Sequence, residues 1–308
     1  RRCVISCGGG VVETMEACSC LRSHWPVIHL KKNIDDVLRT LELSNSGTSR
    51  RPNYGEEIRD VWKRRYPLFQ STSSHQFTVI KGDDDWISLE KEFIDFTLRV
   101  TRLTPSLTGA RHASPFKSFV CLTLPDLATA AKDGSLAQMC QGGVDGCDAV
   151  ELRVDLLRSY ETPFIHDQLA ILRRHLPSSP QVDGGDGGAA PTAIIFTVRT
   201  EPEGGRFPTE ERAMFELLRI AGRAGCEMVD VESRWSRGHL ETFLERLSIT
   251  HPHCAVIGST HAVQRPLCTY ADEEVLKLYE RCGRKFIYDD ASLSNAIVSI
   301  KIVGRAET

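Results

Sequence analysis

From residue 118 onward, short apolar runs alternate with longer stretches in which apolar residues recur every three or four positions. The apolar runs predict strands at 119–124, 149–154, 193–198, 228–231, 255–257 and 297–303. The stretches between them predict helices at 127–140, 166–176, 209–224, 239–249 and 272–282. Strands that alternate with helices favour a parallel α/β fold, here a TIM (β/α)8-type barrel. A doubly wound sheet has the same pattern, so periodicity alone leaves both open.

The first 117 residues form a separate region with a less regular pattern. Strands are predicted at 3–7, 27–30 and 77–80, and helices at 34–43, 56–66 and 87–101. Asn33 is predicted to be the N-cap of the helix at 34–43, and Pro67 is expected to end the helix at 56–66. We therefore predict a partial α/β unit at 1–80, a linker with a helix at 81–117, and a barrel at 118–308.

Composition narrows the class of protein. The formal net charge is -3, which provides neither the basic surface that nucleic acid needs nor a polybasic membrane patch. Apolar runs of about 18 residues do not occur, so no membrane span is expected. The cysteines number 11, and Cys121, Cys226 and Cys254 lie inside apolar runs. Free thiols fit this arrangement best and favour a reducing, cytoplasmic location.

The ends of the chain suggest a piece of a longer protein. The sequence opens without a methionine, directly before a predicted strand, and it closes just after another one. Domains rarely start and stop on core strands, so we expect a fragment in which the barrel is incomplete after its sixth strand. Such an open barrel exposes two sheet edges.

Candidate chemistry lies at the carboxyl ends of the predicted barrel strands, where TIM-barrel active sites form. Charged residues at such ends are often simply solvated, and a single histidine is more often a loop residue than a catalyst. Lys301 is harder to dismiss, because it stands inside the apolar run Ile300-Lys301-Ile302-Val303. Apolar surroundings lower the pKa of an amine and make it nucleophilic, as an imine-forming lysine must be. The polar candidates at these ends are Glu151, Arg153, Asp155, Arg199, Glu203, Asp230, Glu232, His261 and Lys301.

Several motifs, in order, resemble those of type I 3-dehydroquinate dehydratase. They are FVCLTLPDL at 119–127, DAVELRVDLL at 148–157, IFTVR at 195–199, EGGRFP at 203–208, VIGSTH at 256–261 and KIVG at 301–304. The resemblance covers roughly residues 118–308. It implies a TIM-barrel lyase of the shikimate pathway that converts 3-dehydroquinate to 3-dehydroshikimate, with no metal or dissociable cofactor.

The same resemblance implies roles for individual residues. Lys301 would form an imine with the ring ketone, and His261 would remove the adjacent proton and assist the loss of water. Glu203 would orient His261 and support its charge. The substrate's hydroxyls and carboxylate would be held by Glu151, Arg153 and Arg199. The chain departs from the family at Cys121, where a serine is common, and at Ala262, where an acidic residue is usual.

The first 80 residues resemble the C-terminal half of shikimate kinase. The motifs are VISCGGGVV at 4–12, the pair Arg51-Pro52, and RYPLF at 65–69. The resemblance implies that Gly8, Gly9 and Gly10 let the backbone approach shikimate, that Arg65 pairs with its carboxylate, and that Arg51 contacts nucleotide phosphates. The motif GxxxxGK[ST] does not occur, so ATP and Mg²⁺ would belong only to an intact kinase.

A kinase portion followed by a dehydratase resembles the AROM family, which fuses consecutive shikimate-pathway enzymes in fungi. Full-length members are expected to be homodimers that act on small molecules, without nucleic acid or membrane partners. Two alternatives stay open at this point. One is a non-catalytic regulator like the quinate-pathway repressors, which share this domain order, and the other is a truncated chain without activity.

Overall fold

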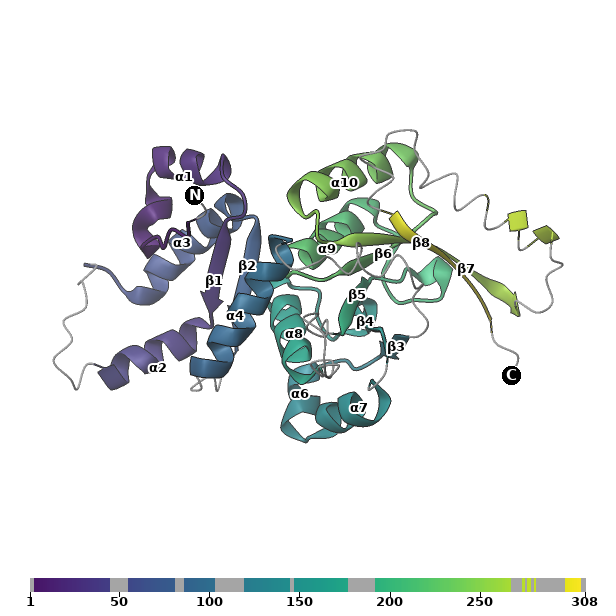
Figure 1. The fold of residues 1–308 in the computed structure, drawn as a ribbon, viewed down its shortest axis with the longest axis horizontal. Coiled ribbons are helices and arrows are strands. Elements are labelled where there is room, and N and C mark those ends of the chain that lie inside the picture. Colours follow the sequence, from purple (N-terminus) through teal and green to yellow (C-terminus); the bar gives the residue numbers. More distant parts are fainter. Residues whose placement is uncertain are drawn as a thin grey trace, which may run out of the picture. The chain divides into compact units, whose positions relative to one another are not determined.

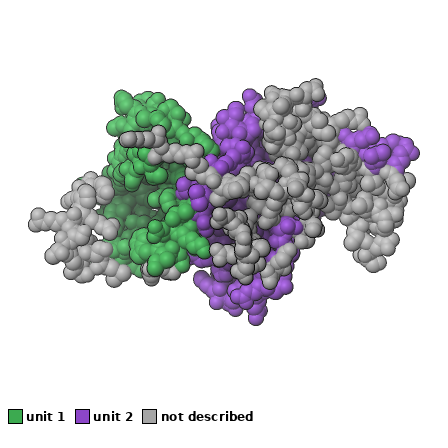
Figure 2. All heavy atoms as spheres, viewed as in Figure 1, with its two compact units in different colours: residues 1–94 green, residues 95–308 purple. Residues whose placement is uncertain are grey.

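The fold is that of a computed structural model, which describes residues 3–44, 55–80, 86–102, 119–144, 147–176, 192–266, 273, 274, 276, 277, 280 and 297–305. The chain divides into two compact units, residues 1–94 and 95–308 (Figure 2). Arg51, the polar loop at 178–191 and most of the helix predicted at 272–282 lie outside the described residues.

The first unit is a small parallel sheet with helices (Figure 1). Strand β1 (Ile28–Lys32) pairs with β2 (His75–Val79), with Ile28 opposite His75. A short 3-10 helix η1 (Gly9–Glu13) leads into α1 (Met15–Arg22), and the strands are joined by α2 (Ile34–Ser44) and α3 (Ile58–Thr72). Asn33 caps α2 as predicted, because its Oδ1 accepts a hydrogen bond from the Asp35 backbone N–H at 2.8 Å.

Two predictions about this unit were wrong. Residues 3–7 form no strand; Val4 and Ile5 are 92% and 78% exposed, and no described strand pairs with them. Pro67 does not end the helix, since α3 continues to Thr72. One proline removes a single helical hydrogen bond, and aromatic packing on both sides outweighs that loss. Phe69 stacks on His29 with ring centroids 4.7 Å apart, and Tyr66 stacks on Trp62 at 4.9 Å.

The second unit contains a six-stranded, all-parallel sheet in the sequential order β3-β4-β5-β6-β7-β8. Within the described part of the chain β3 and β8 do not pair, so the sheet stays open, as the prediction of an incomplete TIM-type barrel requires. The bounds are β3 Phe119–Leu122, β4 Ala149–Arg153, β5 Ala193–Thr197, β6 Met228–Glu232, β7 Ala255–Pro266 and β8 Ile297–Arg305.

Helices cover this sheet in sequence order, and α8, α9 and α10 follow one another along the strands (Figure 1). Their bounds are α8 Thr162–His175, α9 Glu211–Arg223 and α10 Arg237–Thr250. The helix predicted at 127–140 is in fact two, α6 (Leu127–Lys132) and α7 (Ser135–Gly143). The break falls at Gly134, whose φ of 81° belongs to the left-handed region that glycine adopts without strain.

Helix α4 (Trp86–Val100) begins in the first unit, and its residues from Asp95 onward belong to the second. Phe96 and Val100 are buried there against Gly225. Gly225 has a φ of 72°, and a Cβ at this position would lie 2.8 Å from the Phe96 ring. Glycine is therefore required both for the backbone turn and for the approach of α4.

Close approach of α9 to the loop before β7 gives a test of the packing. A Cβ on Gly222 would lie 2.5 Å from Cγ of the buried His251. We expect Gly222→Ala to lower the free energy of unfolding by roughly 1–3 kcal/mol, because the helix or the imidazole must shift. Gly238→Ala in α10 is the matched control, since nothing lies within 4 Å of its Cβ. Urea denaturation of both variants checks this, and equal stability of the two would contradict it.

Candidate active site

One face of the barrel sheet changes from apolar to polar along the strands. Alternate residues of a strand share a face, and parallel neighbours in register share it too. At the amino ends this face carries a buried apolar cluster of Ala149, Ala193, Ile195, Met228, Ala255 and Ile257. Further along the same strands, and just beyond their carboxyl ends, the same alternation reaches Glu151, Arg153, Thr197, Arg199, Asp230, Glu232, Ser259 and His261. The structure thus gathers the predicted polar candidates above an apolar floor.

The substrate-side candidates on β4 are held by neighbours. Glu151 is buried and accepts a hydrogen bond from the Thr197 hydroxyl at 2.7 Å. Arg153 forms a two-pronged ion pair with Asp155, in which Nε donates to Oδ1 at 2.8 Å and Nη2 donates to Oδ2 at 2.7 Å. The Arg153 side chain keeps 19% exposure, whereas that of Asp155 is fully buried.

A tight loop after β5 carries Glu203. Thr200 bridges Phe207, and the 3-10 turn η3 (Glu201–Glu203) ends at Gly204, which has a φ of 83°. The loop then passes so close to β5 that a Cβ on Gly205 would lie 2.0 Å from the Arg199 carbonyl oxygen. Only glycine fits this contact. The sequence Glu203-Gly204-Gly205 is therefore a structural requirement for the position of the Glu203 carboxylate.

Glu203 and His261 form a close pair across the site. The Glu203 Oε2 atom accepts hydrogen bonds from the His261 backbone N–H at 3.1 Å and from its ring Nδ1 at 2.9 Å. Both side chains are about nine-tenths buried. This contact holds the ring orientation, and an ionised Glu203 favours the tautomer with the proton on Nδ1, in which Nε2 is the basic atom.

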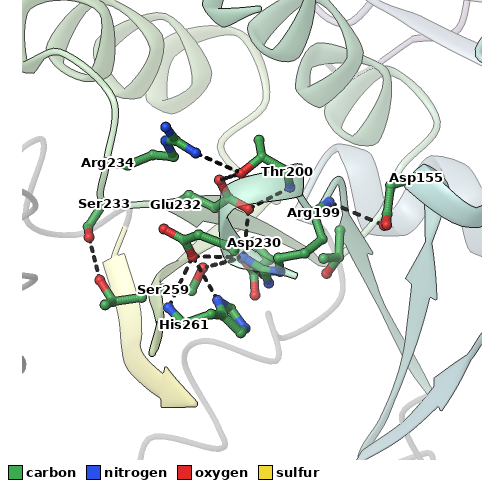
Figure 3. A network of polar contacts seen from close by, with 12 residues as sticks. Asp155, Arg199, Thr200, Asp230, Glu232, Ser233, Arg234, Ser259 and His261 are labelled. Atoms are coloured by element: carbon green, nitrogen blue, oxygen red, sulfur yellow. Dashed lines mark hydrogen bonds and ion pairs between the residues drawn. The ribbon is translucent and has the colours of Figure 1, made fainter. Parts of the chain in front are cut away.

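Arg199 lies at the centre of a polar network (Figure 3). Its guanidinium donates to Asp230 Oδ1 at 3.0 Å and to Glu232 Oε1 and Ser259 Oγ at 3.1 Å each. Glu203 Oε2 lies 3.6 Å from Nη1. The Arg199 side chain is 3% exposed, so carboxylates of the protein surround it in this conformation. A direct contact between Arg199 and substrate stays a prediction.

Thr200 ties the Glu203 loop to β6. Its backbone N–H donates to Glu232 Oε1 at 2.9 Å, and its hydroxyl donates to Oε2 at 2.6 Å. Arg234 then donates to the same hydroxyl oxygen at 3.2 Å. Both oxygens of Glu232 are therefore engaged by the loop and by Arg199 (Figure 3).

Burial dominates the electrostatics of the two glutamates. It raises the pKa of Glu203 to about 7, although the Arg199 guanidinium and the His261 backbone N–H oppose the shift. Burial also raises the pKa of Glu232, and the neighbouring Glu203 adds to this effect. Burial lowers the pKa of Arg199, but Asp230 and Glu232 outweigh it and the net shift is upward. Arg199 thus stays charged while Glu203 titrates near neutrality.

The raised pKa of Glu203 predicts a pH-dependent stability. Its ordinary value is 4.5, so between pH 4.5 and about 7 the folded protein binds more protons than the unfolded chain. The free energy of unfolding therefore falls as pH rises through this window, by at most roughly 3 kcal/mol from this group. Glu203→Gln is expected to remove that fall, as measured by urea denaturation from pH 4.5 to 8. The control is Glu211→Gln on the surface, because hydrogen bonds from Ser236 and His239 lower the pKa of Glu211 despite partial burial. A slope unchanged in Glu203→Gln would contradict the prediction.

Strand β8 brings Lys301 beside the site. Its backbone pairs with β7 so that Lys301 lies opposite Ser259 and Val303 lies opposite His261. Ser259 accepts a hydrogen bond from Arg199, so the backbone of Lys301 lies next to a strand residue that belongs to the network in Figure 3. Ala262, also singled out in the sequence, lies one residue beyond His261 on β7.

The predicted residues of the first unit also meet. An added Cβ on Gly9 would lie 3.5 Å from Arg65 Nη1, and one on Gly10 would lie 3.6 Å from Nη2, so Arg65 lies over this glycine turn. Glu13 accepts a hydrogen bond from Arg65 at 2.8 Å and is also bonded by Arg64. These arginines lower the pKa of Glu13 to about 2. Gly8 lies just before η1 with open space around it.

Sequence reasoning gave no role to four residues that organise the site: Asp155, Asp230, Glu232 and Thr200. Three of them were among the polar candidates at the strand ends, because Asp230 and Glu232 continue the period-2 face of β6 and Asp155 stands two residues after Arg153. Thr200 gave no such signal, since its role depends on how the loop folds back. No group of three or more His, Cys, Asp or Glu side chains able to hold a metal ion occurs among the residues that the structure describes.

Comparisons with known proteins agree with these motifs. The family model described as type I 3-dehydroquinase matches residues 118–285, more than half of the chain, and the one described as shikimate kinase matches residues 1–91. Lys301 lies beyond the first match. Within the described ranges, no helix is long and apolar enough to cross a membrane.

Individual relatives are large multifunctional proteins. The chain is 35% identical over 269 residues to the pentafunctional AROM polypeptide of Komagataella phaffii, covering 85% of this chain and 15% of that protein. It is 36% identical over 237 residues to the same polypeptide of Saccharomyces cerevisiae, covering 74% of this chain and 13% of that one. The chain thus spans about one seventh of the length of these relatives.

A solved structure titled dehydroquinate dehydratase and shikimate dehydrogenase from S. pombe AroM aligns with a TM-score of 0.44. It is 26% identical and covers 63% of this chain and 32% of that one. The sequence matches carry the assignment, since they place two enzyme families in the order that the motifs predicted. The chain belongs to the type I 3-dehydroquinase family.

Proposed function

We propose that residues 118–308 catalyse the dehydration of 3-dehydroquinate to 3-dehydroshikimate through an imine on Lys301. The Glu203–His261 pair is the observation that carries this proposal, because it places an oriented imidazole on the strand next to the one that holds Lys301. Membership of an enzyme family supports this function over that of a non-catalytic regulator.

The proposed reaction balances with the residues of the chain alone. The Lys301 amine attacks the ring ketone and water is lost, which gives a protonated imine. The imine withdraws electrons, so His261 Nε2 removes the adjacent proton and an enamine forms. His261 then returns a proton to the departing hydroxyl, which leaves as water. Hydrolysis of the new imine releases 3-dehydroshikimate and the free lysine, so the mechanism needs no metal or dissociable cofactor.

Glu151, Arg153 and Arg199 are the proposed substrate-binding residues. Arg153 is the most available of the three, because its guanidinium is partly exposed and only Nε and Nη2 are bonded to Asp155. Glu151 offers an acceptor for a ring hydroxyl. Arg199 can take a substrate oxygen only if it gives up a contact with Ser259, Asp230 or Glu232.

Borohydride reduction tests the function. The chain is incubated with 3-dehydroquinate and sodium borohydride, and we expect a reduced adduct that peptide mapping places on Lys301. Lys301→Ala is expected to give no adduct and no ultraviolet absorbance from 3-dehydroshikimate. An adduct on another lysine, or turnover that survives Lys301→Ala, would sink the proposal.

For the first unit we propose a more limited role. Arg65 over the glycine turn fits a shikimate carboxylate, but ATP with Mg²⁺ has no cradle in this chain because the GxxxxGK[ST] motif is absent. The chain by itself is therefore expected to transfer no phosphate from ATP to shikimate. The proposed setting is a cytoplasmic homodimer of the longer parent protein.

A further inference from the structure

Asp155 collects hydrogen bonds from three separate segments of the barrel unit. Its Oδ1 accepts from Arg153 Nε at 2.8 Å and from the Arg199 backbone N–H at 3.2 Å. Its Oδ2 accepts from Arg153 Nη2 at 2.7 Å and from the Arg206 backbone N–H at 3.1 Å. The side chain is fully buried, so one carboxylate joins the end of β4, the end of β5 and the loop that carries Glu203.

The main chain of the same turn provides a second attachment to that loop. The Tyr160 hydroxyl donates to the Asp155 carbonyl oxygen at 3.0 Å. The Tyr160 ring meets Phe207 edge-on, with centroids 5.3 Å apart. Phe207 closes the loop through its bridge to Thr200, so both attachments act on the segment between Thr200 and Phe207.

We propose that Asp155 is a positioning residue for the dehydratase, which orients Arg153 toward the substrate and pins the loop that sets Glu203 against His261. The inference rests on the proposed function. Two nitrogens of the Arg153 guanidinium, Nε and Nη2, donate to Asp155. The third, Nη1, therefore points in a fixed direction and can donate to a substrate oxygen. The backbone N–H of Arg206 lies three residues after Glu203, which makes the carboxylate of Asp155 a direct restraint on the Glu203 turn.

Three variants separate this role from a purely structural one. Asp155→Asn keeps the size of the side chain but removes its charge and one acceptor oxygen. Arg153→Lys keeps the positive charge but removes the two-pronged guanidinium contact with Asp155. The two backbone N–H groups that donate to Asp155 remain in this variant. Glu227→Gln is the matched control, since Glu227 is also buried and paired with Arg173 at 2.6 Å but stands before β6, at the opposite end of the strands.

The readouts are the KM for 3-dehydroquinate and the titration of the His261 ring, followed by NMR and assigned with His261→Ala. We expect Asp155→Asn to raise KM about tenfold and to shift the His261 titration. Arg153→Lys should raise KM without moving the titration, and Glu227→Gln should change only thermal stability. Arg153→Lys keeps the test valid even if Asp155→Asn does not fold.

Two outcomes overturn the inference. If Asp155→Asn changes only thermal stability, as Glu227→Gln is expected to do, then Asp155 has a structural role alone. If Arg153→Lys keeps the wild-type KM, then substrate binding does not need a guanidinium held in a fixed direction. Failure of the proposed function is distinct, because the wild-type chain would then give no borohydride adduct. The His261 titration of Asp155→Asn would in that case still decide whether Asp155 pins the Glu203 loop.

Discussion

Replacing His261 with alanine is expected to slow the formation of 3-dehydroshikimate by about 10³-fold while an imine on Lys301 still forms. The reason is that the proposed electron sink and the proposed base are different residues on neighbouring strands. In the proposed mechanism, Lys301 on β8 supplies the electron sink, whereas the ring of His261 on β7, oriented by Glu203, moves the proton. Removing the base leaves attack on the ketone possible but makes loss of the adjacent proton slow.

Two measurements on the same samples check this prediction. Ultraviolet absorbance follows the product, and borohydride followed by mass spectrometry follows the trapped imine. His261→Ala should show a trapped adduct with little product, and Lys301→Ala should show neither. His239→Ala is the matched histidine control, because His239 is exposed on α10 and pairs with Glu211 away from the network. Wild-type turnover in His261→Ala would refute its role as the base.

Much of the barrel unit follows from its sequence. Apolar runs bounded by turns predicted all six strands, because most residues of a parallel strand covered on both faces are apolar. The motifs at the strand ends predicted which residues come together, and the Glu203–His261 contact is the clearest case. The strand-end residues meet because the register of a parallel sheet places the strand ends in one row, and the loop after β5 then brings Glu203 to His261.

Two predictions about the first unit were wrong for physical reasons that a local sequence pattern does not show. Pro67 ends helices on average, but here Tyr66 and Phe69 pack well enough for α3 to continue. The run at 3–7 has strand character, yet no described strand pairs with it, and an apolar run without a partner forms no sheet. In both cases the outcome depends on which partners a segment meets in the fold, and local propensity does not contain that information.

The polar network was harder to predict than the Glu203–His261 contact. The resemblance to type I 3-dehydroquinate dehydratase implied that Arg199 holds the substrate. In the structure, Asp230 and Glu232 from β6 enclose its guanidinium and leave it 3% exposed. Whether these carboxylates or the substrate hold the guanidinium depends on distances across three strands, which spacing along one strand does not give.

This enclosure leads to the second large effect. Arg199→Met is expected to lower the free energy of unfolding by roughly 3–5 kcal/mol at pH 8, because it leaves buried carboxylates without their shared cation. The loss should be smaller at pH 5. Arg199 lowers the pKa of both Glu203 and Glu232, so without it these groups take up protons more readily and avoid buried charge at low pH. Urea denaturation at the two pH values measures the difference.

Arg237→Met provides the comparison that isolates burial as the cause. Arg237 also pairs with a glutamate, Glu241, at 2.8 Å, but its side chain is 64% exposed on α10. An exposed pair contributes about 0–1 kcal/mol, because water and salt screen it. A loss in Arg199→Met that is no larger than in Arg237→Met, or that does not grow with pH, would show that the network in Figure 3 tolerates an uncompensated negative charge. Arg199 would then be free to leave Asp230 and Glu232 for a substrate oxygen, as the sequence first suggested.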